Sequence, residues 1–151
     1  MRIKFFLIIL FFALNNCGYK PLYSNKNINF SINELNISGP EKIRNQLKNN
    51  LNIFLDQKNK SKIYNININS SSSRSVISKN NEGDPNMYSI ELKINIEILE
   101  NEKIISTKSF GESFDYKNQT NLFNLKKYED NILDNLSEKI YEKIILYLYT
   151  I

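Results

Sequence analysis

Apolar and polar residues alternate most regularly in the middle of the chain. Between residues 88 and 98, apolar residues occupy every even position and polar residues every odd position. This period of two is typical of a strand with one buried and one solvated face. The stretch "YNININ" at 64–69 shows the same alternation. A turn near residues 100–103, followed by a second strand to about Tyr116, predicts a hairpin in which Gly111 marks a bulge.

Two other segments repeat apolar residues every three to four positions, which predicts amphipathic helices. The first runs over about four turns from Pro40, which suits the first helical position, with Ser38 or Gly39 as the cap. Its apolar positions are Ile43, Leu47, Leu51 and Phe54 or Leu55. The second is a long C-terminal helix capped by Thr120, with charged residues throughout that exclude a membrane span. Its apolar stripe comprises Leu122, Leu125, Tyr128, Ile132, Leu136, Ile140, Ile144 and Leu148.

The remaining segments complete one domain. Residues 28–37 alternate with a change of parity, which predicts a strand with a bulge near residues 33–34. Residues 70–86 are polar and contain Gly83, Asp84 and Pro85, so we expect a loop with a short strand extension at residues 76–77. The order β-α-β-β-β-α predicts an α+β fold: a two-layer sandwich with two helices packed on one face of a four-stranded sheet.

The amino terminus has the features of a bacterial secretion signal. Arg2 and Lys4 precede an apolar run that is too short to span a membrane but suits a signal peptide. A buried amino-terminal strand or helix is the alternative, although no polar residue alternates within the run. We therefore divide the chain into a signal peptide (1–16), a lipidated tether beginning at Cys17 (17–27) and a single α+β domain (28–151).

Composition excludes several classes of chemistry. The chain has one cysteine and no histidine, so it can form neither an internal disulfide nor a Ser-His or Cys-His pair. The net charge of +4 is too small to indicate a nucleic-acid partner. The carboxylates near predicted loops and element ends have no spacing typical of a catalytic pair or a metal site. We therefore expect no enzyme activity, no metal and no cofactor. These carboxylates are Asp84, Glu112, Asp115 and Glu129.

The stretch "CGYKPLY" at 17–23 resembles the start of mature LptE, the lipopolysaccharide-assembly lipoprotein, in its alphaproteobacterial form. The later stretch "FSINELNISGPEKIRNQLKNNL" resembles that family's strand and helix with a Leu-Arg-Asn-x-Leu core. Ile43, Arg44, Asn45 and Leu47 occupy the core positions, with Ile replacing the first Leu. The predicted order of elements agrees over nearly the whole mature chain. The two asparagines before Cys17 depart from the usual Gly, Ala or Ser of a lipobox.

The resemblance implies an outer-membrane lipoprotein that faces the periplasm and carries diacylglycerol on Cys17. Such a protein plugs the LptD barrel, helps to assemble it, and serves lipopolysaccharide transport to the outer leaflet without catalysing a reaction. The alternative is a periplasmic lipoprotein that acts as an accessory subunit of another lipid transporter. Because cationic side chains bind phosphates, Arg74 and Lys79 in the expected loop are candidate lipopolysaccharide contacts. Ordinary solvated loop charges are the competing interpretation of both.

Overall fold

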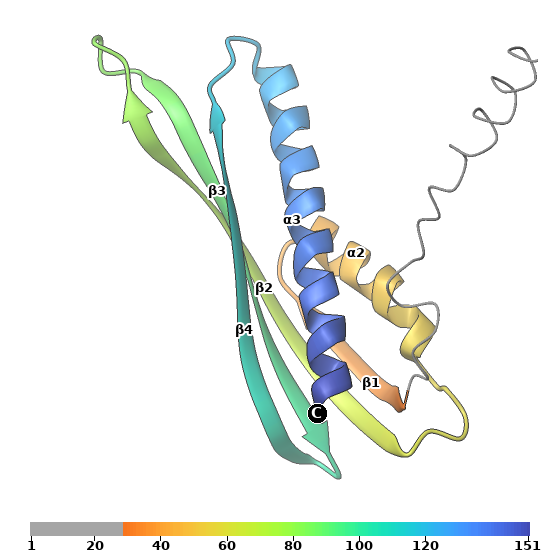
Figure 1. The fold of residues 1–151 in the computed structure, drawn as a ribbon. Helices are drawn as coiled ribbons and strands as arrows, with labels where there is room; N and C mark the ends of the chain where they lie inside the picture. Colours follow the sequence, from red (N-terminus) through yellow and green to blue (C-terminus); the bar gives the residue numbers. More distant parts are fainter. Residues whose placement is uncertain (1–28) are drawn as a thin grey trace, which may run out of the picture.

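A computed structural model describes residues 29–151, and these form one α+β unit (Figure 1). The predicted signal peptide, the predicted tether and Cys17 lie outside the described residues. The order of elements confirms the predicted β-α-β-β-β-α succession, with a short 3-10 helix after the first helix. The elements are β1 (Phe30–Ser38), α2 (Glu41–Leu51), η1 (Asn52–Phe54), β2 (Lys62–Lys79), β3 (Pro85–Glu100), β4 (Lys103–Lys117) and α3 (Leu122–Thr150).

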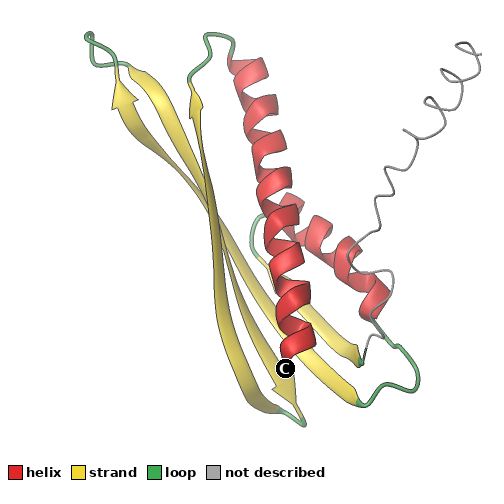
Figure 2. Cartoon of the chain, in the orientation of Figure 1, coloured by secondary structure: helices red, strands yellow, loops and turns green. Residues whose placement is uncertain are grey.

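The four strands form a single mixed sheet in the order β1-β2-β3-β4. β1 lies parallel to β2, whereas β2, β3 and β4 are antiparallel neighbours. A parallel pair needs a long crossover, and α2 provides it. Within residues 29–151, both helices α2 and α3 lie on the same face of the sheet and neither lies on its other face (Figure 2). The predicted two-layer sandwich is therefore confirmed.

The core lies between this sheet and the helices. The even positions of the alternating segments point into it, so Tyr64, Ile66 and Ile68 of β2 are buried. On β3 the buried positions are Ile90, Leu92, Ile94, Ile96 and Ile98. α2 contributes Ile43, Leu47 and Leu51, and Phe54 of η1 stacks on Phe30 with ring centroids 5.3 Å apart. The predicted inward faces of β2, β3 and α2 are thus confirmed.

The predicted irregularity in the first strand is present. The register of β1 against β2 shifts between Ile32 and Glu34. One extra residue in β1 changes which parity faces the helices. Phe30 and Ile32 are buried before the shift, and Leu35 and Ile37 pack against the core after it.

Two expectations about the strands are wrong. The segment 70–79 is not a loop, because β2 continues to Lys79 and pairs with β3 along that length. This serine-rich segment shows no alternation of apolar residues. It is nevertheless a strand, because the backbone groups of the facing half of β3 need hydrogen-bond partners and β2 supplies them. Gly111 does not mark a bulge: it pairs regularly with Lys93, and the shift in the hairpin lies next to its turn, between Ile98 and Leu99.

The helix ends also differ from the predicted ones. Pro40 is the N-cap of α2 rather than its first residue, and α2 has 11 residues before the chain tightens into η1. Asn121, not Thr120, caps α3, because its side chain accepts hydrogen bonds from the backbone N–H groups of Phe123 and Asn124. Leu122 is 78% exposed, so the buried stripe of α3 begins only at Leu125. Among residues 29–151, no helix has the length and apolarity needed to cross a membrane.

Candidate interaction surfaces

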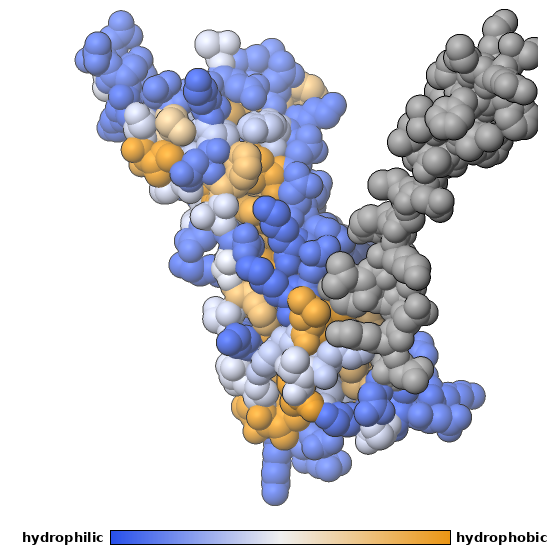
Figure 3. Space-filling view, viewed as in Figure 1, coloured by the Kyte–Doolittle hydropathy of each residue, from blue (hydrophilic) through white to orange (hydrophobic). Residues whose placement is uncertain are grey.

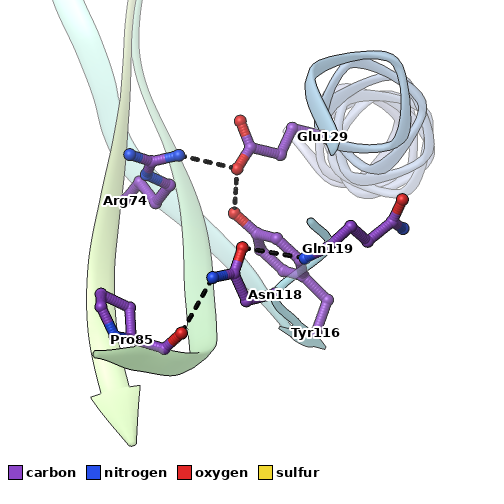
Figure 4. A network of polar contacts seen from close by, with 6 residues as sticks. All are labelled: Arg74, Pro85, Tyr116, Asn118, Gln119 and Glu129. Carbon is purple, nitrogen blue, oxygen red and sulfur yellow. Dashed lines mark hydrogen bonds and ion pairs between the residues drawn. The ribbon is translucent and has the colours of Figure 1, made fainter. Parts of the chain in front are cut away.

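Arg74 lies in the middle of β2 and takes part in a polar network with α3, shown in Figure 4. Its Nη1 lies 2.9 Å from Oε1 of Glu129, and the hydroxyl of Tyr116 donates to the same oxygen. The guanidinium also lies over the ring of Tyr88, 4.7 Å from its centroid. Three strands and α3 are therefore joined by one cation, one carboxylate and two aromatic rings.

The electrostatics of this network follow from burial and from the shared carboxylate. Burial raises the pKa of the Tyr116 hydroxyl, and its hydrogen bond to Glu129 raises it further. The hydrogen bond from Arg74 to Glu129 raises the pKa of the guanidinium above its already high value. Arg74 is therefore a cation that is partly neutralised inside its own domain, although its side chain is 49% exposed.

Lys79 occupies a different environment. It is the last residue of β2, it is exposed, and it has no ion-pair partner within the part of the chain that the structure describes. It lies five positions beyond Arg74 along the strand, which is about 16 Å at ~3.3 Å per residue. The structure thus places both candidate cations in a strand rather than in a loop, and it does not bring them together.

Apart from its end near the exposed Ile63, the helix-free face of the sheet is polar from β1 to β4. On β2 its positions are Asn65, Asn67, Asn69, Ser71, Ser73 and Ser75. Some of these side chains bond across strands: Asn33 Nδ2 donates to Asn65 Oδ1 at 3.0 Å and Asn36 Nδ2 to Asn67 Oδ1 at 3.3 Å. A face of amides and hydroxyls can exchange hydrogen bonds with water or with another polar surface.

A groove follows the outer edge of β1 and passes from α2 to the helix-free face. It measures about 780 Å³. Arg44, Asn45 and Lys48 of α2 line one side, and the backbone and side chains of residues 35–38 form its floor. The other side is lined by Asn67, Asn69, Asn95 and Glu97. In the sequence, Arg44 and Asn45 stand out only as part of a family motif, with no binding role. The four-residue spacing of Arg44 and Lys48 on one helix was the available signal.

A second, smaller groove lies between β4 and α3. Its apolar lining includes Phe114, Tyr128 and Ile132, and its rim carries Glu138 and Lys139. Phe114 is 43% exposed and Tyr128 is 38% exposed, so two aromatic rings face solvent here. On the face shown in Figure 3, hydrophobic residues form separate orange patches within a surface that is mostly hydrophilic.

The carboxylates considered for catalysis are dispersed over the structure. Glu112 pairs with Lys143 of α3 and Glu129 with Arg74, so both serve ion pairs between the sheet and the helix. Asp84 lies in the turn between β2 and β3, and Asp115 lies on β4 opposite Ser89. Within residues 29–151, no group of three or more acidic, cysteine or histidine side chains is placed to hold a metal ion.

No protein-family model and no curated protein sequence matches the chain. Solved structures with the same fold do match. The rare lipoprotein B of Shewanella oneidensis aligns over 80% of this chain and 95% of its own length, with 13% identity and a TM-score of 0.62. A minor lipoprotein of Acinetobacter baumannii aligns over 76% and 87%, with 12% identity and a TM-score of 0.57. A protein of Caulobacter crescentus, also described as a lipoprotein, aligns over 79% and 88%, with 15% identity and a TM-score of 0.53. At these identities the chain is shown to share the fold of several bacterial lipoproteins.

Proposed function

We propose that this chain is an outer-membrane lipoprotein that plugs an LptD-type barrel, helps to assemble it, and thereby serves lipopolysaccharide transport to the outer leaflet. One observation carries the proposal: the domain presents a continuous polar sheet face. The lumen of an outer-membrane barrel is polar, so a plug inside it must satisfy hydrogen bonds on its outer surface. The Asn and Ser side chains of β2, from Asn65 to Ser75, meet this requirement.

The length of the domain suits the same role. β2 has 18 residues, which corresponds to about 60 Å of strand at ~3.3 Å per residue. α3 has 29 residues, or about 44 Å of helix at ~1.5 Å per residue. A bilayer with its headgroup regions is about 40–45 Å thick. A domain of this length, aligned with the barrel axis, could occupy the lumen over its whole height.

The amino-terminal sequence supports the lipid anchor. Cys17 follows a short apolar run with a positive start, and the three structures compared above are described as lipoproteins. Several acyl chains on one cysteine would hold the domain at a membrane, since each buried methylene contributes about 0.8 kcal/mol. We expect the Cys17→Ser variant to leave the membrane fraction or to remain unprocessed, with no acyl mass on its terminal peptide.

Recovery of partners tests the function directly. The tagged full chain is purified from membranes in mild detergent and the co-purifying proteins are identified. We expect an LptD-type barrel. Recovery of an inner-membrane transport complex in its place would favour the alternative, an accessory subunit of another lipid transporter, and recovery of neither would contradict both functions.

Direct lipopolysaccharide contact is a separate part of the proposal, and Lys79 tests it better than Arg74. Because Arg74 is already held by Glu129, reversing its charge would disturb the fold as well as any ligand. Lys79→Glu is expected to weaken lipopolysaccharide binding, since an exposed cation near a phosphate becomes a repelling anion. Lys103→Glu, at the exposed start of β4, is the matched control. Equal binding by both variants and the unmodified protein would remove Lys79 from the contact.

A further inference from the structure

The outer edge of β1 is open over its second half. Near its start, the edge is occupied, because Ile32 forms a bridge to Leu55 and its carbonyl accepts the backbone N–H of Asp56 at 3.0 Å. Beyond the bulge, residues 35–38 have β2 on one side and no strand on the other, as far as the described part of the chain extends. Unpaired edge groups of this kind are ready to accept another strand.

The opposite edge of the sheet is protected in the usual way. β4 carries charged side chains along its length, and charges on an edge strand discourage pairing with another chain. They are Lys103, Lys108, Glu112, Asp115 and Lys117. The exposed part of β1, by contrast, is Leu-Asn-Ile-Ser and has neither a charge nor a proline. Of the two outermost strands, β1 is therefore the one open to pairing.

The groove beside this edge is positively charged on its helical wall. Three sides of α2 have different surroundings. Ile43 and Leu47 face the core, and Lys42 forms an ion pair with Asp134 of α3 at 2.9 Å. Arg44 and Lys48 face the groove. Neither groove cation has a carboxylate partner among the described residues. Two like charges four residues apart on a helix repel each other slightly.

Among residues 29–151, the only acidic side chain in the lining is Glu97, on β3. It belongs to the helix-free face, whereas the two cations come from α2 on the helical face. A strand laid along β1 would direct alternate side chains to these two faces. The side chains on the α2 side would meet Arg44 and Lys48, and those on the other side would meet the amides near Asn36 and Asn67.

We propose that β1 accepts an extended, carboxylate-rich segment of a partner protein as a fifth strand, with its acidic side chains bound by Arg44 and Lys48. Charge decides between possible occupants. The chain's own amino-terminal segment carries no acidic side chain, and after removal of the predicted signal peptide it retains two basic ones, Lys20 and Lys26, so its charge does not complement this wall. A second copy paired through β1 would bring two sets of the same cations together. Backbone pairing supplies the affinity of strand addition, and side-chain charge supplies its selectivity.

Hydrogen–deuterium exchange on the full chain in detergent tests the proposal. The probe is an acetylated and amidated nine-residue peptide of alternating threonine and glutamate. We expect it to slow exchange of the segment 33–39 without protecting residues 70–79 or β4. A lysine-for-glutamate peptide controls for charge. A glutamate peptide methylated at every backbone nitrogen controls for strand pairing, since it keeps the charge and loses every donor.

Variants of the two cations complete the test. The double variant Arg44→Glu with Lys48→Glu is expected to bind the peptide at least about tenfold more weakly, because both charge-assisted contacts are lost. The double variant Arg44→Gln with Lys48→Gln removes both charges without reversing them, so it still tests the contacts if the Glu variant disturbs α2. Lys126→Glu with Lys127→Glu, on α3 and outside this groove, makes the same change in net charge and should not alter binding.

Three results would each overturn the proposal. The groove would be an anion site rather than a strand edge if the methylated glutamate peptide bound as tightly as the unmethylated one. The same conclusion would follow if inorganic phosphate displaced the peptide and the peptide gave residues 33–39 no protection. Protection at residues 70–79 or at β4 would move the pairing to another edge. Unchanged affinity in both the Glu and the Gln variants would show that the α2 cations do not select the ligand.

Discussion

Glu129 is expected to stabilise the fold mainly by satisfying Tyr116. The Tyr116 side chain is 4% exposed and its hydroxyl donates to Glu129, so truncating the carboxylate leaves a buried donor unsatisfied. Loss of such a partner costs about 1–3 kcal/mol. The ion pair with Arg74, which is half exposed, adds at most about 1 kcal/mol. We therefore expect Glu129→Ala to lower the free energy of unfolding by about 2 kcal/mol.

A double-mutant cycle separates the two contributions. Tyr116→Phe removes the hydroxyl and should cost about 1 kcal/mol by itself. In its background, Glu129→Ala loses only the ion pair and should cost no more than about 1 kcal/mol, a coupling of roughly 1 kcal/mol. Urea unfolding followed by circular dichroism at neutral pH measures all four proteins. Glu129→Gln is a further check, because its amide oxygen can still accept from Tyr116.

Independent effects of the two substitutions would contradict the dependence of Tyr116 on Glu129. Additive costs for Tyr116→Phe and Glu129→Ala would show that the hydroxyl and the carboxylate do not depend on each other in solution. A cost below about 0.5 kcal/mol for Glu129→Ala, the range of an ordinary surface substitution, would show that the network contributes little to stability. An unchanged slope in urea is required for either conclusion, since a changed slope would mean an altered denatured state.

Four further predictions concern single sites. Gly39→Ala should destabilise the fold by about 2 kcal/mol or more in urea unfolding, because φ is +119° and a Cβ would lie 2.2 Å from the carbonyl oxygen of Ser70; an intact midpoint would refute the clash. Asn121→Ala should cost about 1 kcal/mol through loss of the α3 cap, whereas Asn124→Ala at an exposed helical position should not. Ser137→Ala should be neutral or stabilising by up to about 1 kcal/mol, because the serine hydroxyl is buried and has no hydrogen-bond partner among residues 29–151; a clear loss of stability would mean that it has one in solution. The contribution of Tyr116 to stability should be fully present below pH 10.0, the ordinary pKa of tyrosine, and be lost as the pH rises above it, because the folded state holds the Tyr116 proton more tightly than the unfolded chain does. Urea midpoints of Tyr116→Phe should therefore fall less over the alkaline range than those of the unmodified protein, and an identical fall would assign the effect to other groups.

Alternation along the chain was enough to place the core. The period of two at residues 88–98 put five isoleucine and leucine side chains of β3 inside, and all of them are buried. The helical period did the same for Ile43, Leu47 and Leu51. The change of parity after Ile32 was also sufficient to locate the bulge in β1. These features depend on neighbours a few residues apart, so a local pattern contains them.

The second half of β2 shows where local pattern is insufficient. "SSSSRSVISK" has turn-forming composition and no apolar period, and only pairing with β3 makes it a strand. Arg74 was singled out for its charge, but its environment depends on Glu129, which is 55 residues away. The bulge predicted at Gly111 is absent for the same reason, because the glycine pairs regularly with Lys93 of the neighbouring strand.

By itself, the sequence determined the faces of the elements, the order β-α-β-β-β-α and the anchor-like position of Cys17, because each follows from residues close together in the chain. Tertiary structure decided which surfaces are built from several elements. The groove of Arg44 and Lys48 exists because α2 crosses from β1 back to β2 and leaves the outer edge of β1 open. Contacts between residues separated by 30 or more positions depend on how the helices pack on the sheet, and a one-dimensional period carries no information about them.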